Sequence, residues 1–270
     1  MEHLLSAWPV VQERLRRAKH ILLLSDYDGT LTPIVEKPEM AIIPSATRRL
    51  LQSLVSQHHF TVGIISGRAL FDLKEKVSVS GAIYAGNHGF EIEGPGLNFV
   101  SPLAEEIRPL FRMMSRLLSL ALETTKGVFV ENKGLTLSVH YRQMPEEKSG
   151  HMKDTFDRVV EDAVSEGKLK VHSGKKVYEL RPAVDWNKGK AISMLMKKYG
   201  KGRPDTLPIY LGDDLTDEDG FDVISLTSNG LSIHIGSDTD ASGAYYYLKS
   251  PDEVRDFLEK LLEYAGRIGK

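Results

Sequence analysis

The sequence predicts an α/β protein with a doubly wound, mainly parallel, Rossmann-like core sheet, interrupted by an inserted domain of αββαββ pattern. Three observations support this prediction. Short apolar runs alternate with amphipathic segments toward both ends of the chain, this alternation stops in the middle, and two of the apolar runs end abruptly in carboxylates. Because short continuous apolar runs suit strands buried on both faces, the two ends of the chain are expected to build one parallel sheet.

The expected core strands are short, apolar or β-branched, and bounded by Gly, Pro, Asp or Ser. They are Ile21–Ser25, Phe60–Ser66, Ala82–Ala85, Leu207–Leu211 and Leu231–Ile235. Three amphipathic segments are expected to be helices: Ser45–Gln57, Lys188–Tyr199 and Asp252–Tyr264. In a sheet of this kind, ligands bind beyond the carboxyl ends of the strands. Asp26, Ser66 and Asp213 fall at those ends.

The middle of the chain is expected to form the inserted domain over residues 101–182, which leaves 1–100 and 183–270 for the core domain. Apolar residues recur at helical spacing over 103–122 and again over 152–163. Each helical stripe precedes a predicted hairpin: Gly127–Glu131 with Leu135–Arg142, then Leu169–His172 with Val177–Leu180 around the turn 173–176. A hairpin alone is marginal, but two hairpins and two helices can form an independent layer.

Composition excludes several classes of function. A net charge of −2 over 270 residues gives no general attraction to nucleic acid or to an anionic membrane, so any binding of anions must be local. The absence of cysteine excludes disulfides and thiolate metal sites. No apolar run approaches the ~20 residues that span a bilayer, and the charged segment before residue 21 does not resemble a signal peptide. We therefore expect a cytoplasmic protein, and the balanced charge together with the inserted domain favours a monomer.

The first apolar run ends in two aspartates, Asp26 and Asp28, followed by Gly29. Residues two apart on an extended chain point to the same side, so the two carboxylates should emerge together. The run that precedes Gly212 ends similarly in Asp213. Carboxylates from two strand ends would form an oxygen-rich pocket suited to a hard divalent cation, typically Mg²⁺. The alternative for Asp26 and Asp28 is a simple turn or helix cap.

Such a pocket favours phosphoryl chemistry. A phosphate monoester is a dianion, so an attacking carboxylate needs a cation to offset the repulsion. We assign Asp26 as nucleophile and Asp28 as general acid, and later as the base that activates water. Gly29 lets the backbone turn sharply, so that amide groups there and at Thr30 can point at phosphate.

Two further residues complete the expected catalytic set. The Ser66 hydroxyl can bond a phosphoryl oxygen beside a helix that begins near Ala69; the alternative is a serine N-cap. Lys188 stands where a helix starts, although a cation is mildly unfavourable there. Neutralising Asp26 and the phosphoryl group would explain its position. The alternatives are a solvated lysine, or Lys190 in the same role.

The second acidic segment divides into expected roles. Asp213, at the strand end, is the predicted metal ligand, while Asp214 and Asp217 are expected to support it by orienting water or Lys188. The pair Thr216 and Asp219 has the spacing of a capping box. With Glu218, Asp219 is therefore assigned to the helix start.

These motifs, taken in order, resemble those of a known superfamily. The segments 26–30, 66, 188 and 212–214 match the four motifs of the haloacid-dehalogenase-like phosphohydrolases. Within that superfamily the chain resembles the trehalose-6-phosphate phosphatase family. The segments that carry the closer resemblance are 31–34, 63–68, 86–89, 131–134, 139–142, 179–182 and 211–218.

The resemblance implies Mg²⁺ held by the Asp26 carboxylate, the Asp28 backbone carbonyl and the Asp213 carboxylate, and an aspartyl-phosphate on Asp26. It makes the inserted domain a cap that closes over a sugar. The cap residues expected to face the sugar are Glu131, Lys133, Arg142, Lys176 and Glu179. Gly67 and His88 are expected to contact the substrate, and Arg68 to help hold the phosphate side or the cap. Solvated hairpin tips remain the alternative for Lys133 and Lys176, and a structural turn for His88.

The leading hypothesis is therefore Mg²⁺-dependent hydrolysis of trehalose 6-phosphate, a small-molecule sugar phosphate, with a trehalose-phosphate synthase as candidate partner. The first alternative is another capped sugar phosphatase, acting on a sucrose, mannosyl or hexose phosphate. A phosphomutase ranks lower. The alternative of another class is a non-catalytic regulatory domain that binds sugar phosphate.

Overall fold

The computed structural model describes residues 1–174, 176–200 and 205–268. Lys175, in the predicted turn of the second hairpin, lies outside the described residues. The chain divides into two compact units, one formed by Met1–Phe99 with Trp186–Lys270 and the other by Val100–Asp185. The first unit thus contains both ends of the chain and the second is an insertion.

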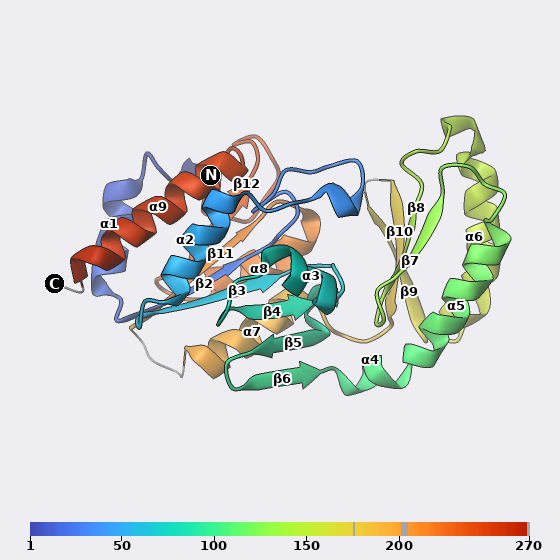
Figure 1. The fold of residues 1–270 in the computed structure, drawn as a ribbon, viewed down its shortest axis with the longest axis horizontal. Coiled ribbons are helices and arrows are strands. Elements are labelled where there is room, and N and C mark those ends of the chain that lie inside the picture. Colours follow the sequence, from blue (N-terminus) through green and yellow to red (C-terminus); the bar gives the residue numbers. More distant parts are fainter. Residues whose placement is uncertain (175, 201–204, 269–270) are drawn as a thin grey trace. The chain divides into compact units, whose positions relative to one another are not determined.

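The first unit is built on a nine-stranded sheet, β1-β13-β12-β11-β2-β3-β4-β5-β6 (Figure 1). Neighbouring strands from β1 to β4 are parallel, and β5 is antiparallel to β4. The bounds in chain order are Glu2–His3, His20–Ser25, Phe60–Ile65, Ile83–Gly86, Glu91–Gly94, Leu97–Val100, Thr206–Gly212, Leu231–Ile235 and Tyr246–Leu248 for β1 to β6 and β11 to β13. The predicted doubly wound, mainly parallel sheet is confirmed.

Helices cover both faces of this sheet because its strands are apolar on both sides. Alternate residues of β2 enter different cores: Leu23 packs in the cluster that includes Leu51 and Phe257, and Leu24 in the cluster that includes Ile192 and Phe221. Four helices line the first face: α1 (Trp8–Arg17), α2 (Ser45–Val55), α3 (Leu70–Val77) and α9 (Pro251–Ile268). On the second face lie α7 (Lys188–Tyr199) and α8 (Leu215–Ser225); η1 (Pro38–Met40) and η2 (Asn87–Gly89) are short 3₁₀ turns.

Strand register brings the carboxyl ends of three strands to the same level. Ser25 of β2 lies opposite Leu211 of β11 on one side and opposite Ile64 of β3 on the other. The residues that follow these positions therefore leave the sheet at one edge. Asp26, Ser66 and Asp213 are among them.

The second unit carries its own antiparallel sheet, in the order β7-β8-β10-β9 (Figure 1). Its strands are β7 (Phe129–Asn132), β8 (Leu137–His140), β9 (Leu169–Gly174) and β10 (Val177–Pro182). One face packs on helices, with Leu137, Val139 and Leu180 buried against Phe111 and Phe156. The helical elements are α4 (Pro102–Glu106), α5 (Arg108–Ala121), η3 (Glu146–Lys148) and α6 (Ser149–Ser165). The unit runs from Val100 to Asp185, where the sequence predicts 101–182.

Two local predictions were wrong or incomplete. The helix expected over 103–122 is divided at Ile107, because Pro109, in the first turn of the new helix, lacks the N–H that would continue the first one. Strands β1, β5, β6 and β13 were not predicted, since each has at most four residues. Among the described residues, no helix combines the length and the apolar character needed to cross a membrane.

Candidate active site

The two acidic strand ends lie against each other at the carboxyl edge of the core sheet. The amide of Asp26 donates to the Leu211 carbonyl at 2.8 Å, which ties the end of β2 to β11. Gly29 has a φ of 84°, and a Cβ placed there would lie 2.1 Å from a carboxylate oxygen of Asp213. Only glycine therefore allows the loop after β2 to pass so close to Asp213.

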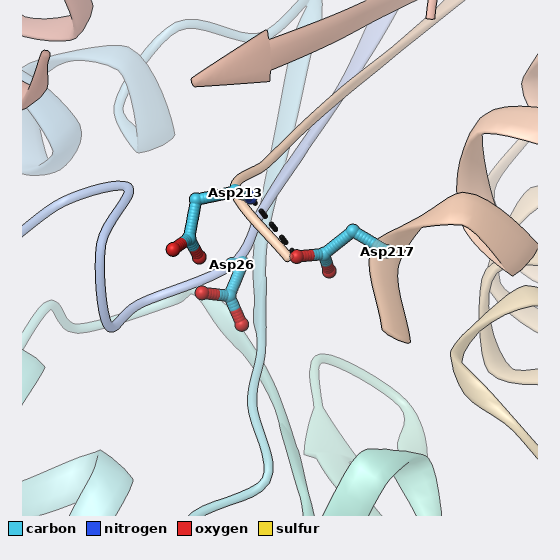
Figure 2. A group of neighbouring side chains, drawn as sticks. All are labelled: Asp26, Asp213 and Asp217. Carbon is cyan, nitrogen blue, oxygen red and sulfur yellow. Dashed lines mark hydrogen bonds between the residues drawn. The ribbon is translucent and has the colours of Figure 1, made fainter. Parts of the chain in front are cut away.

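Three carboxylates converge at this edge (Figure 2). Asp26, Asp213 and Asp217 each offer a carboxylate oxygen within 4.8 Å of the others. Asp26 and Asp217 are buried, and Asp213 is partly buried. The structure thus brings together Asp26 and Asp213, which lie 187 positions apart in the chain, as the sequence predicts for the ends of neighbouring parallel strands.

Lys188 bridges two of these acids from the first turn of α7. Its Nζ donates to Asp26 Oδ1 at 2.7 Å and to Asp217 Oδ1 at 2.6 Å, and its side chain is 3% exposed. Asn187 caps the helix by accepting the N–H of Lys190, so Lys188 begins the helix as predicted. Burial alone would lower the pKa of Lys188, but Asp217 and Asp26 raise that pKa well above the usual lysine value.

Asp217 is saturated with hydrogen-bond donors. Its Oδ1 accepts from Lys188 and from the hydroxyl of Tyr210, and its Oδ2 accepts the backbone N–H groups of Asp213 (3.0 Å) and Asp214 (3.2 Å). A carboxylate with both oxygens engaged in this way is better suited to orient Lys188 and the Asp213 backbone than to bind a cation.

The same contacts correct the predicted capping box. The box is formed by Asp214 and Asp217, not by Thr216 and Asp219. Asp214 accepts the N–H and the hydroxyl of Thr216, while Asp217 bonds the N–H of Asp214. The prediction was wrong because aspartate is as good an N-cap as threonine, and the helix starts two residues earlier than the Thr216 pattern implies.

The charge balance of the site suits a divalent cation. Three carboxylates lie close together, and one buried ammonium group, that of Lys188, contacts two of them. Burial raises the pKa of Asp26 well above the usual aspartate range; Lys188 opposes this rise, whereas Asp217 and Asp213 add to it. A doubly charged cation beside Asp26 and Asp213 would offset this excess of negative charge, and oxygen donors are the ligands that such cations prefer.

The Asp28 carboxylate is paired with Arg68 in this structure. Arg68 holds both of its carboxylate oxygens, Nε to Oδ2 and Nη2 to Oδ1, each at 2.7 Å. The same guanidinium donates to Asp72 at 2.8 Å and to the Pro38 carbonyl at 2.9 Å. The guanidinium of Arg68, predicted to help hold the phosphate side or the cap, therefore bonds Asp28, Asp72 and the Pro38 carbonyl.

Ser66 directly follows β3, and its hydrogen bonds link the segment after β3 to the turn after β4. Its hydroxyl accepts the N–H of Arg68 at 3.2 Å, and its carbonyl accepts the N–H of His88 at 2.9 Å. The alternative of an N-cap is excluded, because α3 begins at Leu70 with Ala69 as its cap. A Cβ at Gly67 would lie 2.7 Å from the His88 ring, so glycine lets His88 pack here. Thr30, the other predicted substrate contact of this edge, is fully buried.

In the second unit, the predicted sugar-facing residues divide into two groups. Glu131 and Glu179 lie on the same face of the sheet, each opposite Ser138 on the strand between them. Lys133 donates to Glu179 at 3.0 Å, and Arg181 bonds its other oxygen at 2.7 Å. These charges form a paired cluster rather than solvated hairpin tips.

Lys176 and Arg142 lie apart from that cluster. The Lys176 backbone carbonyl accepts the N–H of Tyr141. Lys176 directly precedes β10, and Arg142 lies just after β8, at the same end of this strand pair. The Lys176 ammonium pairs with Glu146 at 2.5 Å, and Arg142 is exposed. The two groups therefore mark opposite ends of the hairpin strands.

Comparison with known proteins identifies the family. The trehalose-phosphatase family profile matches residues 24–252. The chain belongs to the trehalose-phosphatase family. Trehalose-phosphate phosphatase B of Arabidopsis thaliana is 35% identical, over 93% of this chain and 68% of its own length. Trehalose 6-phosphate phosphatase RA3 of Zea mays is 35% identical, over 93% and 72%.

Solved structures agree with this assignment. The C-terminal domain of the C. albicans trehalose-6-phosphate phosphatase superposes with a TM-score of 0.78 at 25% identity, covering 94% of this chain and 96% of that one. Trehalose-6-phosphate phosphatase of Aspergillus fumigatus gives a TM-score of 0.63 at 28% identity, with the same coverage. The predicted family is confirmed, and so is the predicted class of enzyme, a phosphoric monoester hydrolase.

Two residues that bond predicted site residues, one in each unit, were missed by sequence analysis. Tyr210 is the one side chain with a polar end in the apolar run Leu207–Leu211, a signal that it needs a buried partner. Arg181 stands two residues after Glu179 in β10, one residue beyond the strand that the sequence predicts, so the two share a face. Both signals were present in the sequence.

Replacing Tyr210 with phenylalanine should lower the free energy of unfolding by about 1.5–3 kcal/mol, because the hydroxyl bonds an ionised, fully buried carboxylate. Tyr264→Phe is the matched control, since that buried hydroxyl bonds the neutral Leu15 carbonyl and should cost only about 1 kcal/mol. Urea denaturation measures both. Equal losses, or a fully stable Tyr210→Phe variant, would contradict the assigned role of Tyr210 in holding Asp217.

Proposed function

We propose that this protein hydrolyses trehalose 6-phosphate to trehalose and phosphate, with Mg²⁺ and through an aspartyl-phosphate on Asp26. The observation that carries the proposal is the buried contact of Asp26 with Lys188, beside Asp213, at the carboxyl edge of the core sheet. The chain's membership of the trehalose-phosphatase family supports the same reaction. The names of the relatives support the choice of substrate, and the geometry of the site supports the proposed chemistry.

In the first step, an Asp26 oxygen attacks phosphorus and the bond to the sugar oxygen breaks. Bound Mg²⁺ would offset the charge of the phosphoryl group, with Asp26 and Asp213 as carboxylate ligands and the Asp28 carbonyl as a further one. Lys188 keeps Asp26 oriented and adds a second positive charge. The backbone amides of Gly29 and Thr30 and the Ser66 hydroxyl would hold phosphoryl oxygens, with Gly67 and His88 beside them.

The departing sugar oxygen needs a proton, and we assign this transfer to Asp28. In the structure the Asp28 carboxylate accepts bonds from Arg68 at both oxygens, so it must leave the guanidinium and take up a proton before it can donate. In the second step the same carboxylate takes a proton from water, which attacks the aspartyl-phosphate and releases phosphate. Asp214 and Asp217 position the surrounding groups rather than react.

We assign recognition of the sugar to the second unit. Carboxylates accept hydrogen bonds from hydroxyl groups and ammonium or guanidinium groups donate to them. Glu131 and the Lys133–Glu179 pair offer both kinds of group on one face of the sheet, and Arg142 and Lys176 offer donors near its end. The second unit would thus act as the cap that selects the disaccharide.

A panel of sugar phosphates tests the substrate. Phosphate release is measured with the trehalose, sucrose, mannosyl and hexose esters, each with Mg²⁺ and after treatment with EDTA. We expect the trehalose ester to have the highest kcat/KM. We expect EDTA to remove activity that added Mg²⁺ restores, because the clustered carboxylates of Asp26 and Asp213 would otherwise repel the phosphate dianion.

The other outcomes of the panel discriminate among the alternatives. A higher kcat/KM for a different ester would replace the proposed substrate with that sugar phosphate. Binding of sugar phosphate without turnover of any ester would favour a regulatory domain. Activity that persists at full rate in EDTA would contradict the metal assignment.

A further inference from the structure

The face of the second unit's sheet that points away from its helices carries an aromatic pair that the proposed function does not use. Val139 and Val130 pair across β8 and β7 on the face that packs on the helices. Phe129 and His140, the next pair in register, therefore point to the opposite face. Phe129 is 43% exposed and lies outside the hydrophobic cluster of this unit.

The two rings are stacked and fixed in place. Their centroids are 4.4 Å apart and their planes differ by 11°. The His140 Nε2 bonds the Glu131 carboxylate at 2.7 Å, which holds the imidazole flat behind the phenyl ring. An exposed phenylalanine on a rigid support presents a flat apolar surface that is already ordered in the free protein, so a ligand that binds to it loses little side-chain entropy there.

Polar groups flank this surface at a spacing that suits a sugar. Phe129 and His140 form one row across the sheet; Glu131, Ser138 and Glu179 form the next row on the same face. Two residues along a strand rise about 7 Å, roughly the width of a hexose ring with its hydroxyl groups. Small-molecule sites combine such aromatic surface with a few placed polar groups.

We propose that Phe129, supported by His140, is a platform for a hexose ring: the C–H face of the ring stacks on the phenyl group while Glu131 accepts bonds from its hydroxyl groups. The inference rests on the proposed function, and within it we assign the platform to the glucose unit that carries no phosphate. Phe129 is thereby a residue that determines preference for a disaccharide phosphate over a smaller one.

Kinetics of Phe129 variants test this assignment, with trehalose 6-phosphate and acetyl phosphate as substrates. Acetyl phosphate reaches the same Asp26 chemistry but carries no sugar. Phe129→Ala and Phe129→Leu should each raise KM for trehalose 6-phosphate about five- to tenfold, with little change in kcat and none for acetyl phosphate. Phe129→Trp should keep the parent KM, because it keeps a flat ring. Leu120→Ala, an exposed apolar residue of α5, is the control.

Failure of the Phe129 platform and failure of the proposed substrate would give different kinetic results. An unchanged KM in Phe129→Ala, or an equal loss with acetyl phosphate, would overturn the platform. Full activity in Phe129→Leu would show that any apolar side chain suffices and would also overturn stacking. If the parent protein prefers another sugar phosphate, the proposed substrate fails and the same variants are judged on that ester. If Phe129→Ala then leaves its KM unchanged, the platform fails as well.

Discussion

Replacing Asp26 with asparagine should reduce phosphate release by roughly 10⁴-fold or more, because the amide lacks the ionised oxygen that attacks phosphorus. The substitution is nearly isosteric, and its amide oxygen still accepts the Lys188 hydrogen bond now made at 2.7 Å. The fold should therefore survive. Burial makes ionisation of Asp26 unfavourable, so the uncharged asparagine should leave the melting temperature equal or higher.

The measurement is single-turnover phosphate release, with circular dichroism to establish folding. Asp252→Asn serves as the control for the same chemical change at an exposed helix end, where the side chain pairs only at the surface with Arg255. It should release phosphate at the parent rate. A folded Asp26→Asn variant that releases phosphate within tenfold of the parent would contradict both the nucleophile and the covalent intermediate.

The position of the site follows from features that a single sequence contains. Asp26 and Asp213 each follow an apolar run, and the carboxyl ends of neighbouring parallel strands must share an edge. Lys188 starts a helix, where a cation needs a compensating partner. Strand endings and helix starts are local signals, so the proximity of these three residues could be predicted without coordinates.

The partners chosen by individual side chains could not be predicted in this way. Asp28 bonds Arg68, although the spacing of the motif equally allows it to face Asp26. Tyr210 reaches Asp217 because α8 starts at Leu215, two residues before the predicted capping box would place its first turn. Each contact depends on a rotamer or on a helix boundary, and sequence patterns determine such boundaries only to within a few residues.

Replacing Lys188 with methionine should both abolish activity and destabilise the fold by about 3–5 kcal/mol. Methionine fills a similar volume, but it leaves Asp26 and Asp217 buried without the cation that both now contact. The cost of breaking a buried ion pair from one side comes chiefly from the charge left behind. Lys190→Met, two residues further along the same helix at an exposed position, is the matched control and should cost well under 1 kcal/mol.

The pH dependence of this loss provides a test that simple damage to packing would not pass. Without Lys188, the pKa of Asp26, already raised by burial, should rise further. When the pKa of an acid is higher in the folded state than in the unfolded state, the protein loses stability as pH rises through the folded-state pKa. It regains that stability on acidification. The gap in unfolding free energy between the parent and Lys188→Met should therefore narrow as pH falls below neutrality. A gap of constant size from pH 8 to pH 5 would show that Lys188 stabilises the fold by filling space, and would remove its assigned role as the counter-charge of Asp26.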